Sequence, residues 1–293
     1  MAKKSEQPPI AQAKVAPPSA PPEPAKVNND EEKNLVVQPA GGELQDQTLD
    51  EMLMQDAGAG LKGLGANDFA IPFLAILQKG SPQVSKANSK YVKDAQIGMV
   101  MNTVTLELYD GDLGIIFIPC AYNKMVVEWK PRDSGGGFVA QHKDGDQLVQ
   151  RSTRNERGQL VAPETGNILI DTAYHYGLHL HEDGRLEWAV VSMYSTQLKK
   201  SRVWNTMMRN IVVKGPKGPF NPPSFSHMYR LTTVGETKDT YDWMGWRIIS
   251  EGRITDVDVY KAAREFSLAV EKGNVRVTAP PQEASDTQEE VPF

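Results

Sequence analysis

Apolar and polar residues alternate with a period of two along several short segments, which is the pattern of half-buried β-strands. Turn-forming pairs that end in glycine separate many of these segments, at 110–111, 144–145, 157–158 and 183–184. The pattern predicts strands at 99–109, 114–119, 122–130, 168–181, 185–194, 227–234 and 241–250. The pair at 183–184 lies between two alternating segments and predicts a hairpin.

Two longer segments have the spacing of amphipathic helices instead. Segment 255–271 begins with Thr255 in a Ser/Thr-x-x-acid capping pattern and is followed by Gly273, a residue typical of helix ends. Segment 195–211 carries its apolar residues at helical spacing: Leu198, Trp204, Met207, Met208 and Ile211. A third, short amphipathic helix is predicted within 44–56. The apolar cluster 69–77 opens the folded part, with Pro72 where the first turn of a helix would tolerate it.

Short antiparallel strands with inserted helices predict a mainly β fold with a few helices (α+β), as a decorated OB-like barrel or sandwich. Residues 1–67 are predicted to be a disordered, Pro-rich arm and linker, because they hold too few apolar residues to offset their ordering entropy. Residues 68–274 form the predicted domain. Residues 275–293 are predicted to be a disordered acidic tail.

The net charge of -5 conceals a segregation along the chain. Residues 1–68 carry a balance of -5, residues 69–278 a balance of +4, and residues 279–293 a balance of -4. A mildly basic body between acidic arms is typical of an anion-binding domain whose tails compete with its ligand. A balance of +4 over the body is also within ordinary scatter.

Catalytic, metal and membrane signatures are missing from the sequence. Cys120 is the only cysteine, which excludes an internal disulfide and a thiolate cluster. His179 and His181 share one strand face and could ligate a metal, but solvent-facing strand positions are the favoured interpretation. No nucleophile, metalloprotease or phosphate-loop motif occurs. We therefore expect a cytoplasmic protein that is not an enzyme and needs no metal or cofactor.

The segment 122–138 combines aromatic and basic residues, the two kinds that non-specific binding of single strands requires. Aromatic faces stack on bases, and cations follow the phosphates. An extended strand places Tyr122, Lys124 and Val126 on one face and Val127, Trp129 and Pro131 on the other. The predicted DNA contacts here are Tyr122, Lys124, Trp129, Lys130, Arg132 and Phe138. The alternative is a core strand with a buried Trp129 and an ordinary glycine loop.

A second group of candidate DNA contacts lies on the helix 195–211 and the loop that follows it. On the helix these are Lys199, Lys200 and Arg202, and on the loop they are Lys214, Lys217 and Phe220. The segment 215–223 is rich in Gly and Pro and predicts a rigid, exposed loop. A plain connector is the competing interpretation of this loop.

The last residues of the chain are acidic and end on an aromatic ring joined to the terminal carboxylate. Such a segment can bind a partner, with the ring in an apolar pocket and the acids against a basic rim. The predicted partner-binding residues are Asp286, Glu289, Glu290, Val291, Pro292 and Phe293. An ordinary acidic terminus is the alternative.

The sequence EEVPF closely resembles the C-terminal tip of bacterial single-stranded DNA-binding proteins, and several phage proteins of this class have similar tails. The resemblance implies that the tail recruits replication or recombination proteins, such as a polymerase, helicase or recombinase. The bacterial family has a smaller core and no Pro-rich arm, so no core contact is transferred from it.

These patterns together predict a non-enzymatic protein that binds single-stranded DNA without sequence preference, and the resemblance to phage proteins of this class implies a role in phage replication or recombination. Two rivals stay open: a virion or assembly protein, and a recombination mediator that anneals strands. A nuclease would need a cluster of acids that the sequence lacks. Whether the protein is a homo-oligomer also stays open.

Overall fold

The computed structural model describes residues 48–63, 70–275 and 277, so the acidic tail prediction at 286–293 lies outside the described residues. The chain divides into two compact units, Met1–Ala59 and Gly60–Phe293. The described part of the first unit, residues 48–59, contains the short helix α1 (Leu49–Gln55), which confirms the helix predicted within 44–56. Thr48 and Glu51 form a reciprocal capping box at its start, and all of its side chains are exposed.

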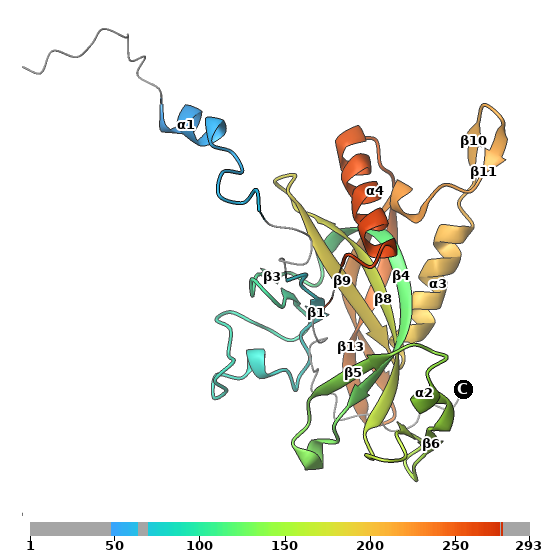
Figure 1. The fold of residues 1–293 in the computed structure, drawn as a ribbon. Helices are drawn as coiled ribbons and strands as arrows, with labels where there is room; N and C mark the ends of the chain where they lie inside the picture. Colours follow the sequence, from blue (N-terminus) through green and yellow to red (C-terminus); the bar gives the residue numbers. More distant parts are fainter. Residues whose placement is uncertain (1–47, 64–69, 276, 278–293) are drawn as a thin grey trace, which may run out of the picture. The chain divides into compact units, whose positions relative to one another are not determined.

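The second unit is mainly β, as predicted, and its largest sheet is curled into a half-barrel (Figure 1). The strands of this sheet follow the order β13-β12-β4-β8-β7-β6, with β5 beside β4 and β9 beside β8. All of its strand pairs are antiparallel. The strands are β4 (Ile115–Trp129), β5 (Phe138–His142), β6 (Thr153–Arg154), β7 (Leu160–Val161), β8 (Ile168–Leu180), β9 (Leu186–Tyr194), β12 (His227–Lys238) and β13 (Tyr241–Arg253).

Two smaller sheets and three further helices complete the unit. The first small sheet contains β1 (Leu74–Ile76), β2 (Val100–Asn102) and β3 (Leu108–Tyr109), and the second is the hairpin of β10 (Val213–Gly215) and β11 (Gly218–Phe220). The helices are α2 (Gln147–Arg151), α3 (Gln197–Arg209) and α4 (Val257–Glu271). Single 3-10 turns lie at Pro82–Val84, Arg132–Ser134 and Ser224–Ser226.

Strand β4 joins the two predicted strands 114–119 and 122–130 into one. The pairing of β4 with β8 shifts register between Pro119 and Ala121, where a β-bulge bends the strand. A bulge accommodates Pro119, which has no N–H to donate to the ladder. Opposite it, Gly177 of β8 leaves no room for a side chain, because a Cβ there would lie 2.3 Å from the carbonyl oxygen of Ile118.

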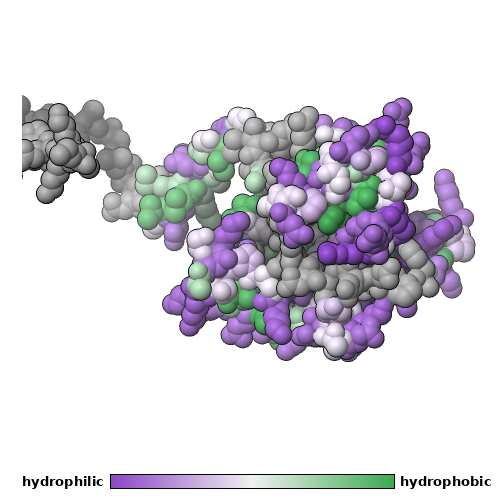
Figure 2. Space-filling model, turned by 90° about the horizontal axis from the view of Figure 1, so that it is seen from below, coloured by the Kyte–Doolittle hydropathy of each residue, from purple (hydrophilic) through white to green (hydrophobic). Residues whose placement is uncertain are grey.

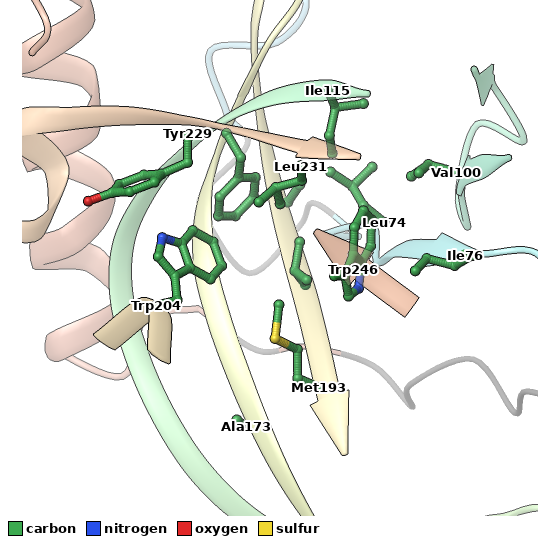
Figure 3. Packing of buried hydrophobic residues seen from close by; sticks show 13 residues of the cluster. Leu74, Ile76, Val100, Ile115, Ala173, Met193, Trp204, Tyr229, Leu231 and Trp246 are labelled. Atoms are coloured by element: carbon green, nitrogen blue, oxygen red, sulfur yellow. The ribbon is translucent and has the colours of Figure 1, made fainter. Parts of the chain in front are cut away.

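The sheet has a hydrophobic cluster on each of its faces, and one helix belongs to each cluster. Trp204 of α3 packs with Phe117 and Tyr229 on one face. Figure 3 shows Trp204 and Tyr229 side by side at one end of this cluster, with Val100 and Ile76 at the other. On the other face, Phe266 of α4 packs with Tyr174, Tyr176 and Leu178.

The apolar cluster 69–77, to which the sequence assigned no element, is extended in its described part and includes β1, because a continuous apolar run has no period that separates helix from strand. Three predictions of local structure are wrong. Segment 99–109 is two strands, because Asn102 turns the chain by accepting hydrogen bonds from the backbone N–H groups of Val104 and Thr105. The exposed loop 215–223 contains part of a hairpin. Asp256 caps α4 in place of Thr255 and accepts hydrogen bonds from the next turn.

Candidate nucleic-acid interface

Helix α3 has one face buried in the core and one exposed basic face. Trp204 and Ser201 are buried, and the Ser201 hydroxyl lies 2.8 Å from Nε2 of His175 in β8. This contact fixes the rotation of the helix about its axis. Lys199, Arg202 and Arg209 therefore lie on the exposed side.

The β10–β11 hairpin extends this basic face beyond the end of α3 (Figure 1). Asn221 attaches the hairpin to the helix, because its side-chain amide donates to the carbonyl oxygens of Arg209 and Ile211 at 2.8 and 2.9 Å. Lys214 and Lys217 are exposed on the hairpin. The Phe220 side chain is 50% exposed, which leaves much of its ring accessible to a ligand.

An acid-free stretch of sequence underlies this surface. Residues 188–235 contain no Asp or Glu and seven Lys and Arg. Lys200 forms an ion pair with Glu236, and Arg230 pairs with Glu251 at 2.6 Å. The other five form no ion pair with the residues that the structure describes: Lys199, Arg202, Arg209, Lys214 and Lys217. Arg209 is the one cation of this set that the predicted contacts did not include, and the length of the acid-free stretch was the signal that could have identified it.

The second half of strand β4 has the predicted alternation. Val126 is buried on one face, and Val127 and Trp129 belong to the cluster on the other. Tyr122 is 43% exposed, and its ring centroid lies 5.2 Å from that of His175. Lys124 has carboxylates at 3.2 Å on Asp171 and at 3.9 Å on Asp144, so its charge is already partly neutralised.

The remaining predicted contacts lie at the β4–β5 connection. Trp129 and Phe138 are half-buried and pack edge to face with centroids 5.9 Å apart. Lys130 is exposed, and its N–H donates to the carbonyl of Gly137, which closes a tight loop around Arg132. The side chain of Arg132 is outside what the structure describes. The structure thus places the predicted contacts in two groups, one on α3 and its hairpin and the other on β4 and β5.

A groove runs beside the hairpin, between β11 and the start of α4. It has a volume of about 290 Å³, and Phe220 forms part of its wall. Other apolar wall residues are Val213, Pro222, Ile254, Val257 and Tyr260, and the charged ones are Arg253 and Asp256.

His175 supports the interface from below without being part of it. It is fully buried, and burial lowers its pKa to about 3, so the ring is neutral at neutral pH. Its ring stacks on Trp204 with centroids 4.4 Å apart. His175 therefore connects exposed Tyr122 to α3 through two ring contacts and one hydrogen bond.

His179 and His181 do not face solvent, contrary to the favoured interpretation of their sequence pattern. His179 is 3% exposed, and burial together with nearby His181 and Arg185 lowers its pKa to about 3. The hydrogen-bonded pairing of β8 with β9 places Glu187 directly opposite His179.

No helix in the described residues is long and apolar enough to cross a membrane.

Seen from below, the described surface is mostly hydrophilic, and hydrophobic residues form separate small patches (Figure 2).

Comparisons with curated proteins and with solved structures gave no match. A comparison with protein families matched residues 41–276 to the model of the Pam3 phage gp34-like protein. This match covers most of the chain and all four described helices and the full sheet. The chain is therefore a phage protein and belongs to the Pam3 phage gp34-like protein family.

Proposed function

We propose that this phage protein binds single-stranded DNA without sequence preference and without catalysing a reaction, in support of phage replication or recombination. The observation that carries the proposal is the exposed face of α3 and its hairpin, hereafter the basic face: Lys199, Arg202, Arg209, Lys214, Lys217 and Phe220.

Two properties of the basic face favour a nucleic acid over another anion. Its cations are spread along a helix and a hairpin, which suits a chain of phosphates better than a single small ligand. Phe220 adds an exposed ring on which a base can stack, and stacking is independent of base identity. A single strand offers unpaired bases for this contact, whereas a duplex keeps its bases stacked inside.

A second candidate contact region lies at β4 and β5 and consists of Tyr122, Trp129, Lys130 and Phe138. Tyr122 and Lys130 are exposed and available to a ligand, while Trp129 and Phe138 first pack against each other. Lys124 and Lys200 would have to exchange their carboxylate partners for phosphates. We therefore assign the primary contacts to the basic face and a secondary role to β4 and β5.

The tail residues Glu289, Glu290 and Phe293 complete the proposal through their resemblance to bacterial tips. In the proposed mechanism the acidic tail occupies the basic face weakly in the absence of DNA. Bound DNA displaces it, and Phe293 then recruits replication or recombination proteins.

The test is a fluorescence-anisotropy titration of a labelled dT oligonucleotide at several salt concentrations. The variant replaces Lys199, Arg202 and Arg209 with Gln. A matched control replaces Lys86, Lys90 and Lys93 with Gln, because these exposed lysines lie away from α3 in sequence and carry the same total charge. Both variants have the same net charge, so a difference in their affinity for DNA depends on where the removed cations lie.

We expect submicromolar binding by the wild type and the control, and much weaker binding by the α3 variant. The slope of log K against log salt should fall by about 2 for the α3 variant, since each lost phosphate contact removes about 0.7 for single strands. Equal binding by both variants would place the interface elsewhere. Absence of binding by all three proteins would reject the proposal and favour an assembly role, while rings or filaments on DNA would indicate strand annealing.

A further inference from the structure

Three metal-ligand side chains meet on one face of the β8–β9 hairpin. His179 lies near the end of β8 and His181 directly follows the last residue of that strand, and Glu187 of β9 is the cross-strand partner of His179. One donor atom of each residue lies within 4.8 Å of the other two. Nε2 of His181 is 3.2 Å from Oε2 of Glu187, and Nδ1 of His179 is 3.9 Å from the same oxygen.

This cluster is enclosed by the protein. The side chains of His179, His181 and Glu187 are 4%, 7% and 18% exposed. Nδ1 of His179 has no hydrogen-bond partner among the described residues, although it is buried and directed at Glu187. An unpaired buried nitrogen is unfavourable, and a bound cation would satisfy it.

The donor separations fit a four-coordinate ion. Zn²⁺ binds His nitrogen at roughly 2.0–2.1 Å and carboxylate oxygen at roughly 2.0–2.2 Å, so tetrahedral ligands lie about 3.4 Å from one another. The separations of 3.2 and 3.9 Å lie on either side of that value. Small rotations of the side chains would complete the geometry.

Outer residues orient the ligands, as they do in protein metal sites. The side-chain amide of Asn102 donates to Oε1 of Glu187 at 2.9 Å, which leaves Oε2 directed at the two histidines. The orientation of that amide is fixed, because its oxygen accepts two backbone N–H groups in the following turn. The rings of Tyr109 of β3 and His179 pack in a T-shaped arrangement with centroids 4.7 Å apart.

We propose that His179, His181 and Glu187 bind one divalent transition-metal ion, with Zn²⁺ as the ion that suits this donor set. A water molecule would supply the fourth ligand, because the cluster offers three. The ion would link the β8–β9 hairpin to β2 and β3 through Asn102 and Tyr109, and so stabilise this end of the sheet.

Arg185 competes with the ion for His181. Its guanidinium lies 3.1 Å from Nδ1 of His181, and because Arg only donates, Nδ1 accepts and Nε2 carries the proton. Binding of the ion at Nε2 transfers that proton to Nδ1 and releases Arg185. Glu107 at 3.7 Å and Asp183 at 3.8 Å are the carboxylates that then hold the guanidinium.

The test is calorimetric titration of the tag-free, chelator-treated full chain with Zn²⁺ alone. The central variant is Glu187→Gln, which keeps the size of the side chain and an oxygen for Asn102. His142→Asn is the matched control, because His142 also pairs with a carboxylate, Glu128, at 2.8 Å outside the cluster. Thermal unfolding with and without Zn²⁺ gives a second readout, and the visible spectrum with Co²⁺ reports four-coordinate geometry.

We expect the wild type and His142→Asn to bind one equivalent of Zn²⁺ and to gain thermal stability from it. Glu187→Gln should bind at least 100-fold more weakly and gain no stability, and Asn102→Ala should weaken binding by roughly 10- to 100-fold. The proposal is overturned if the wild type binds no stoichiometric Zn²⁺, or if Glu187→Gln binds as tightly as the control. If Glu187→Gln does not fold, His181→Asn takes its place under the same criteria.

Discussion

The hydroxyl of Ser201 on α3 lies 2.8 Å from Nε2 of His175 on β8, and this buried hydrogen bond connects the basic helix to the sheet. Nδ1 of the same histidine has no hydrogen-bond partner among the described residues. His175 therefore depends on Ser201 for the one hydrogen bond that its ring makes with the described part of the chain.

Replacing Ser201 with Ala should destabilise the protein by about 1–3 kcal/mol, because both ring nitrogens of His175 would then be buried and unpaired. Thr206→Ala is the matched control, since it removes an exposed hydroxyl from the same helix, and this hydroxyl donates to the carbonyl of Arg202 within the helix. The measurement is urea unfolding of both variants. Equal loss of stability in the two variants would show that the buried hydrogen bond to His175 stabilises the fold no more than the exposed one of Thr206.

Acid should destabilise the fold partly through His175. Its pKa is about 3 in the folded chain and about 6.5 in the unfolded chain, so between these values only the unfolded chain binds the proton. Stability is therefore complete above pH 6.5 and falls as the pH falls, by about 1.4 kcal/mol per pH unit for one such group. This contribution of His175 to the pH dependence of stability ends near pH 3, where the folded state also binds the proton.

The measurement is the free energy of unfolding between pH 6 and pH 4, for the wild type and His175→Asn. We expect a shallower slope for the variant by about 1.4 kcal/mol per pH unit, because the remaining groups contribute equally to both proteins. His179 has its pKa lowered in the same direction, so the variant keeps part of the dependence. Parallel curves would show that His175 binds the proton to the same extent in the folded and the unfolded chain.

Gly177→Ala should destabilise the sheet by about 1–3 kcal/mol or more, because its Cβ would overlap the carbonyl oxygen of Ile118 and the ring of Phe117. Gly235→Ala in β12 is the control, since the nearest atom to a Cβ there is 4.0 Å away. Thermal unfolding compares the two. Similar melting temperatures would contradict the close approach of β4 and β8 at the bulge.

The strand-like patterns and the turn signals between them were sufficient to predict the long strands. Within the sheet, β8 buries consecutive residues, because hydrophobic clusters cover both of its faces. The strand pattern failed at Pro119, where the sequence indicates a break and long-range pairing imposes a bulge within one strand. It also failed at 69–77, where every described residue from Ile71 to Leu77 is buried and no alternation exists.

The candidate sites depend on contacts that sequence order does not reveal. Lys124 and Lys200 looked like free cations, but their partners Asp171 and Glu236 come from distant strands. His179 and His181 were expected to face solvent. The alternation of residues along a strand shows which side chains share a face of the sheet, but it does not show whether another element covers that face. Tyr109 and Asn102 cover that face from another sheet. Lys199, Lys214 and Lys217 are exposed as predicted, because helical spacing and a Gly- and Pro-rich loop place side chains on the surface independently of distant contacts.

Phe220 should contribute to the affinity for single strands by stacking on a base. Phe220→Leu removes the aromatic face while keeping an apolar side chain against Gly215, which the ring contacts in the hairpin. Base stacking contributes about 1–3 kcal/mol by substitution, so affinity for dT should fall by roughly tenfold or more. Leu113→Ala is the control, because Leu113 is an apolar residue that is 70% exposed on another turn.

Phe220→Trp restores an aromatic face and should restore affinity in the same anisotropy titration. The variant separates stacking from simple apolar contact, because Leu and Trp both fill space but only Trp offers a π-face to a base. The salt slope should stay unchanged in both Phe220 variants, since neither removes a cation. Equal affinity of Phe220→Leu, Phe220→Trp and the wild type would exclude Phe220 from the interface and leave binding to the cations of the basic face alone.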